Sequence, residues 1–66
     1  MTKKYIYEKV SLKRLKDYPF ETNIKKPYFV EIDTGDNVFI EEFDKKDKAK
    51  NYMNSLKSKS KRVYLN

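Results

Sequence analysis

Between Pro27 and Phe43 the chain reads Pro27-Tyr28-Phe29-Val30-Glu31-Ile32-Asp33-Thr34-Gly35-Asp36-Asn37-Val38-Phe39-Ile40-Glu41-Glu42-Phe43. Two runs of alternating apolar and acidic residues flank the only glycine of the chain. Aromatic and β-branched residues favour strands, and glycine supplies the positive φ that a tight turn requires. This stretch therefore predicts a β-hairpin over residues 28–43, and the rest of the chain is expected to build on it.

The register of the hairpin depends on the length of its loop. A two-residue loop would mix charged and apolar side chains on one face. An odd-numbered loop centred on Gly35 instead pairs Ile32 with Val38, and Val30 with Ile40, which gives one β-branched face. Because side chains alternate along a strand, a slip of one residue inverts the buried set. We predict the odd-numbered loop, which leaves an aromatic and acidic second face of Phe29, Glu31, Asp33, Phe39, Glu41 and Phe43.

The aromatic and acidic face has three interpretations. Residues 11–26 can cover Phe29 and Phe39, which makes both rings part of the core. The face can dock a protein with a basic surface, since large exposed apolar patches mark interfaces. A homodimer can also form across it. For the docking interpretation we expect the contacts from Phe29, Glu31, Asp33, Phe39 and Glu41.

Residues 44–58 have the pattern of a capped amphipathic helix. Asp44 can accept hydrogen bonds from the free N–H groups of the first turn, and Asp47 suits the positive end of the helix dipole. Apolar residues recur at the spacing of one helix face, at Ala49, Tyr52, Met53 and Leu56. This pattern predicts a helix over residues 45–58 whose apolar stripe belongs to the core.

The flanking segments complete a single small domain over residues 1–66. Lys4–Val10 is predicted to be a strand, followed over residues 11–16 by a short helical turn or by a continuation of the strand with a bend. Residues 17–27 form a loop that crosses the sheet, and 62–65 form a short closing strand. The expected fold is α+β: a three- or four-stranded, mainly antiparallel sheet with one helix on one face, in the order β-turn-β-β-α-β.

The composition excludes several classes of function. The 66 residues contain no cysteine and no histidine, which removes thiolate metal sites and the commonest general base. Asp33, Asp36 and Asn37 surround the glycine, but the spacing of a calcium loop is absent. We therefore expect no catalytic residues, no metal and no cofactor. No stretch has the length of a membrane span, and the expected location is the cytoplasm. The preference for Lys over Arg is typical of bacterial or phage genes rich in A and T.

Charge is distributed unevenly along the chain. Residues 1–26 carry eight basic and three acidic side chains, residues 27–44 carry six acidic and no basic ones, and residues 45–66 carry eight basic and one acidic, which sum to +6. A net positive charge favours anionic partners such as nucleic acid. Candidate phosphate contacts cluster on and after the helix, at Lys45, Lys46, Lys50, Lys57, Lys59, Lys61 and Arg62, with Tyr5, Tyr7 and Tyr64 as candidate stacking rings.

The hairpin and helix together resemble a known DNA-binding arrangement. A hairpin followed by Phe43-Asp44-Lys45-Lys46-Asp47-Lys48-Ala49-Lys50-Asn51-Tyr52-Met53-Asn54-Ser55-Leu56 looks like the arm-binding amino-terminal domains of phage-type integrases. In that family a three-stranded sheet lies in the DNA major groove. The acidic hairpin of this chain departs from the family pattern because its carboxylates would repel phosphates, so the resemblance supplies no binding residues here.

Two functions follow from these patterns. The first is a small non-enzymatic regulator or adaptor, of the kind that phages and mobile elements encode, which docks on another protein through the acidic hairpin face. The alternative is a nucleic-acid-binding protein that uses the lysine-rich helix and termini largely without regard to sequence. The two functions assign opposite surfaces to the binding site.

Overall fold

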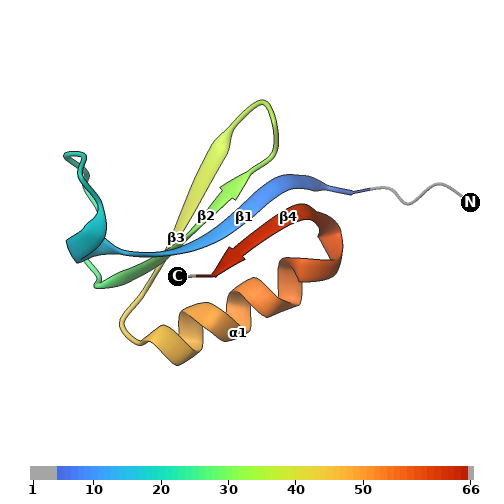
Figure 1. The fold of residues 1–66 in the computed structure, drawn as a ribbon. Helices are drawn as coiled ribbons and strands as arrows, with labels where there is room; N and C mark the ends of the chain where they lie inside the picture. The colour runs from blue at the N-terminus through green and yellow to red at the C-terminus, as the bar shows by residue number, and fades with distance from the viewer. Residues whose placement is uncertain (1–4, 66) are drawn as a thin grey trace, which may run out of the picture.

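The computed structural model describes residues 5–65, which form a four-stranded sheet and one α-helix (Figure 1). The strands are β1 (Tyr7–Arg14), β2 (Tyr28–Asp33), β3 (Val38–Phe43) and β4 (Ser60–Leu65). The helix α1 spans Lys46–Leu56, and short 3-10 turns follow β1 at Leu15–Asp17 and α1 at Lys57–Lys59. The α+β class and the bounds of the hairpin predicted from the sequence are confirmed.

The strand order is β3-β2-β1-β4. β2 is antiparallel to both of its neighbours, β1 and β3, whereas β4 lies parallel to β1. The helix therefore carries the chain from one edge of the sheet to the other across a single face (Figure 1). Parallel strands need such a crossover connection, and here it places α1 over the two central strands.

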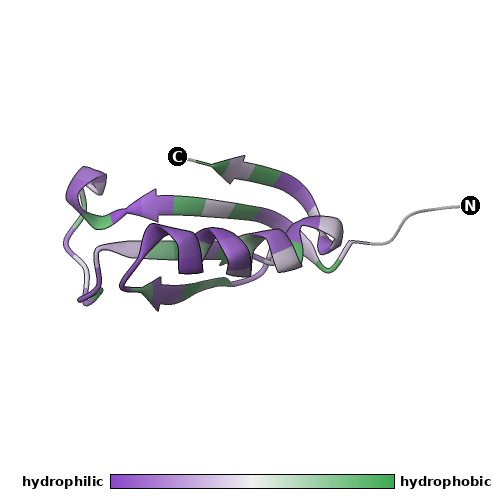
Figure 2. Cartoon of the chain, turned by 90° about the horizontal axis from the view of Figure 1, so that it is seen from below, coloured by the Kyte–Doolittle hydropathy of each residue, from purple (hydrophilic) through white to green (hydrophobic). Residues whose placement is uncertain are grey.

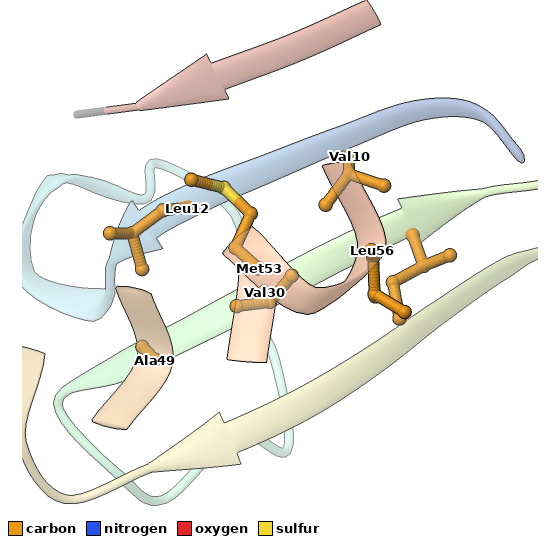
Figure 3. Close-up of a cluster of buried hydrophobic side chains, with 7 residues drawn as sticks. Val10, Leu12, Val30, Ala49, Met53 and Leu56 are labelled. Carbon is orange, nitrogen blue, oxygen red and sulfur yellow. The ribbon is translucent and has the colours of Figure 1, made fainter. Parts of the chain in front are cut away.

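The core lies between α1 and the face of the sheet that α1 covers. Val10 and Leu12 of β1 and Val30 and Ile32 of β2 meet the helix (Figure 3). The predicted helix stripe is confirmed, because Ala49, Met53 and Leu56 are buried and Tyr52 packs half-buried against Phe43 with ring centroids 5.3 Å apart. Each fully buried aliphatic side chain contributes about 1.5–3 kcal/mol to folding.

The predicted register of the hairpin is wrong. Asp33 pairs with Val38 and Ile32 with Phe39, so the loop has four residues, 34–37, and not an odd number. Within it the Thr34 N–H donates to the Asn37 carbonyl at 2.9 Å, and the Asn37 N–H donates to Thr34 Oγ1 at 3.1 Å. Gly35 has φ +97°, which confirms the expected positive φ. These loop hydrogen bonds fix the strand pairing.

The observed register inverts the faces of β3. Val38 and Ile40 lie on the side away from the helix and are 54% and 41% exposed, while Phe39 and Glu41 lie on the helix side. The prediction assumed that the β-branched residues must be buried. Because β3 is an edge strand and α1 covers mainly β1 and β2, burial does not select the register there.

Four predicted features of the strands and the helix are also corrected. The predicted strand Lys4–Val10 is displaced to Tyr7–Arg14, and Lys4 lies outside the described residues. The helical turn over residues 11–16 is wrong and the alternative of a longer strand is right, because Ser11 and Leu12 continue the ladder with β2. The cap of α1 is Lys45 without a side-chain hydrogen bond, not Asp44. The closing strand starts at Ser60.

Candidate functional site

The five residues predicted to dock a protein do not form one patch. Phe29 is completely buried on the face of the sheet away from α1, where the Tyr18 ring packs edge-on against it at 5.2 Å. The expectation that residues 11–26 cover the rings is thus correct for Phe29. It is wrong for Phe39, which lies on the other side of the sheet and is 57% exposed.

The acidic members of this set are divided in the same way. Glu31 pairs with Lys13 at 3.4 Å, and Asp33 Oδ1 accepts the Gly35 N–H at 2.8 Å. Both carboxylates therefore hold the sheet and the turn together. Glu41 is exposed on the helix side, where its negative charge adds to burial in raising the pKa of Tyr52. The structure brings Phe29, Glu31 and Asp33 to one face and Phe39 and Glu41 to the other.

Glu42 has a role that the sequence did not indicate. Its Oε1 accepts the backbone N–H of Lys25 at 2.8 Å and of Lys26 at 3.2 Å, which ties the long loop to β3. These hydrogen bonds, the one from Lys25 first, lower the pKa of Glu42 below its usual value of 4.5; desolvation opposes the shift, and the charges of the two lysines add to it. The carboxylate is thus an anchor of the fold.

We expect Glu42 to titrate below pH 4.5 in the folded protein. Since its folded pKa is depressed, its stabilising effect is present above pH 4.5 and is lost as the pH falls through the folded pKa. NMR titration of the Glu42 carboxyl checks this, and the amide signals of Lys25 and Lys26 should shift with the same midpoint. Glu42→Gln should remove that transition from both amides. A carboxyl midpoint at or above 4.5 contradicts the anchor.

The seven residues predicted to contact nucleic acid are all exposed. They lie on the outer side of α1, in the 3-10 turn after it and on β4, at Lys45, Lys46, Lys50, Lys57, Lys59, Lys61 and Arg62. Figure 2 looks onto the side of the sheet that α1 covers and shows hydrophilic residues along most of the helix. Within residues 5–65 the ion pairs are Lys13–Glu31 and Arg14–Asp17, so none of the seven charges is neutralised by an ion pair there. We call these seven residues the basic surface.

The basic surface extends around the β4 edge of the sheet. Lys61 points to the helix side together with Val63, which packs against the core. Arg62 points to the opposite side and lies next to Lys9 of β1. Lysine and arginine on both sides of an edge strand can contact successive phosphates of a polyanion that crosses this edge.

The candidate stacking rings are placed differently from one another. Tyr64 is 51% exposed on the side of the sheet away from α1, and Lys9 Nζ lies 5.9 Å from its ring centroid. Tyr7 is half-buried and packs against the core. A further ring that sequence reasoning missed is Phe20, which is 66% exposed in the loop after β1. Its position beside the sheet depends on contacts between distant residues, which the sequence pattern does not reveal.

Two negative findings concern the described residues. Between residues 5 and 65, no group of three His, Cys, Asp or Glu side chains is arranged to hold a metal ion. Over the same residues no helix has the length and apolar character needed to span a membrane.

Comparisons of the chain with protein-family models, with curated proteins and with solved structures found no match.

Proposed function

We propose that this protein binds nucleic acid through the basic surface, largely independently of sequence. The observation that carries the proposal is the row of exposed lysines on α1, the following turn and β4, none of them in an ion pair within residues 5–65. Each lysine that neutralises a phosphate releases counterions, which gives affinity that falls with salt. The net charge of +6 adds long-range attraction.

The chemistry of the basic surface supports phosphate contacts rather than base reading. Six of its seven cations are lysines, which act as flexible point charges. Recognition of base edges in the major groove relies mainly on arginine, asparagine and glutamine held in fixed geometry. Two of the hairpin carboxylates that would repel phosphates are engaged within the fold, Glu31 with Lys13 and Asp33 with the turn, whereas Glu41 is exposed.

Fluorescence anisotropy with labelled oligonucleotides of about 20 residues, single-stranded and duplex, tests the proposal. We expect sub-micromolar binding at low salt. The slope of the logarithm of the binding constant against the logarithm of the salt concentration should correspond to about four or more phosphate contacts. Binding should persist at physiological ionic strength. Attraction that vanishes there would be generic to any basic protein and would exclude the function.

Docking on another protein is the second candidate function, and the outer edge of β3 favours it. This edge strand exposes the apolar side chains of Val38, Phe39 and Ile40 next to Glu41. Exposed edge strands can pair with a strand of a partner. The double variant Phe39→Ala, Glu41→Lys should lose such a partner in pull-down while its affinity for nucleic acid is not weakened. Retention of the captured protein by this variant would exclude β3 as the docking site.

A further inference from the structure

The side of the sheet away from α1, which we call the open face, combines exposed rings with cations. The register places Lys9, Ser11 and Lys13 of β1 on this face, next to Arg62 and Tyr64 of β4. In the described residues no α-helix covers it; the loop after β1 lies at one end of the sheet, where its Tyr18 packs on Phe29 (Figure 1). The open face adjoins the basic surface at Arg62.

Three aromatic rings form a connected series on the open face. Phe29 is fully buried in β2, and Tyr18 packs edge-on against it with centroids 5.2 Å apart. Phe20 in turn packs edge-on against Tyr18 at 5.3 Å and remains 66% exposed. Lys13 Nζ lies 5.6 Å from the Tyr18 centroid, which helps to fix that ring. Phe20 is thus an exposed ring held by the half-buried Tyr18, which in turn packs on the buried Phe29.

A hollow lies beside this ring. It is lined by Lys13, Arg14, Asp17, Tyr18, Pro19 and Phe20. Its cations are already paired, Lys13 with Glu31 and Arg14 with Asp17, so the local charge is nearly balanced. A planar group with little charge of its own, such as a nucleobase, fits such a hollow better than a phosphate does.

The second exposed ring, Tyr64, lies on the edge strand β4. Tyr64 of β4 pairs with Ser11 of β1, whereas Phe29 of β2 pairs with Lys13 of β1. The positions of Tyr64 and Phe29 therefore differ by two strands across the sheet and by two residues along it. The spacing between strands and the rise per residue put the backbones of Phe29 and Tyr64 about 12 Å apart. Lys9 and Arg62, which are neighbours on adjacent strands, supply charge beside Tyr64, and neither is in an ion pair within residues 5–65. An extended strand of a few nucleotides spans the distance between Tyr64 and Phe29, and Phe20 lies beyond Phe29 through its contact with Tyr18.

We propose that the open face binds single-stranded nucleic acid, with Phe20 and Tyr64 as base-stacking rings and with Lys9 and Arg62 as phosphate contacts. This inference rests on the proposed function and gives it a substrate class. Bases are available for stacking in single strands and not within a duplex, and stacking tolerates any sequence. The basic surface then continues the phosphate track over the β4 edge.

The variants Phe20→Leu and Tyr64→Leu test the stacking, because leucine keeps apolar bulk and removes the ring. We expect each to weaken binding of a labelled oligothymidine of about 20 nucleotides about tenfold. Affinity for a duplex of the same length should change less than about twofold, and the salt slope should be unchanged since no charge is removed. The matched control is Phe39→Leu, an equally exposed ring on the helix side, which should change neither affinity.

The outcomes separate the two proposals. Equal losses for single strand and duplex, or no loss in either leucine variant, overturn stacking while the proposed function stands. Absence of wild-type binding to both probes overturns the proposed function and the stacking with it. NMR titration with a short oligothymidine gives a second measurement: the ring signals of Phe20 and Tyr64 should shift, whereas those of Phe39 on the helix side should not. Shifts confined to α1, without shifts of these two rings, would overturn the stacking site.

Discussion

Replacement of Lys57, Lys59 and Lys61 by glutamine should lower the affinity for nucleic acid on the order of a hundredfold at about 0.1 M salt. The three lysines are exposed, are not in ion pairs within residues 5–65 and follow one another from the end of α1 to the start of β4. Each lost phosphate contact lowers the logarithmic salt slope by about 0.9 on duplex DNA. Anisotropy titrations at several salt concentrations measure both quantities.

A matched variant separates a local surface from net charge. Lys16, Lys25 and Lys26 are equally exposed, and their replacement by glutamine removes the same three charges. Lys16 follows the end of β1. The lysines of the first triple lie around Ser60, which pairs with Tyr7 at the beginning of β1. The length of β1 separates the two sites by about 26 Å. We expect the control to lose only a few-fold in affinity. Equal losses in the two triples would mean that net charge, and not the basic surface, causes binding.

Glutamine is chosen over glutamate for a structural reason. Lys57 is the C-terminal cap residue of α1, where the helix dipole is negative. A glutamate there would weaken the helix, and loss of folding would be confused with loss of contacts. Circular dichroism of both triples should match the wild type, which makes the comparison of affinities valid.

Much of the fold could be predicted because local patterns and global packing agree. The helix stripe at Ala49, Met53 and Leu56 is buried where the spacing indicated, and the hairpin strands have the predicted bounds. The end of β1 was harder to predict, since Ser11 and Leu12 are strand residues only because β2 pairs with them. The local pattern that also suits a short helical turn over residues 11–16 is outweighed by this ladder.

The site was less predictable than the fold because it depends on the register. One residue of loop length decides whether Phe39 shares a face with Phe29, and the loop length follows from hydrogen bonds between Thr34 and Asn37. The basic surface, in contrast, required no register. Lysines that are too numerous to be paired with nearby acids are exposed in any arrangement that buries the apolar stripe of α1.

Truncation of Phe29 should give the second large effect, a loss of stability. Its comparison with truncation of Phe39 tests the register of the hairpin. Phe29→Ala should destabilise the protein by about 3–5 kcal/mol, because it removes a fully buried ring and leaves Tyr18 without its contact. A chain of 66 residues has a free energy of unfolding of roughly 3–10 kcal/mol. The variant should therefore be largely unfolded or close to it at room temperature. Urea denaturation followed by circular dichroism measures the loss.

Phe39→Ala is the matched variant, with the same change of side chain in the neighbouring strand. Phe39 is 57% exposed, so its truncation should cost about 1 kcal/mol or less. In the odd-numbered register both rings would lie on one covered face, and both variants would be destabilised alike. Similar losses would therefore contradict the four-residue loop at 34–37 and the division of the acidic hairpin between the two faces of the sheet. A large difference requires Phe29 beneath Tyr18, and it is this contact that fixes the loop carrying Phe20 on the open face.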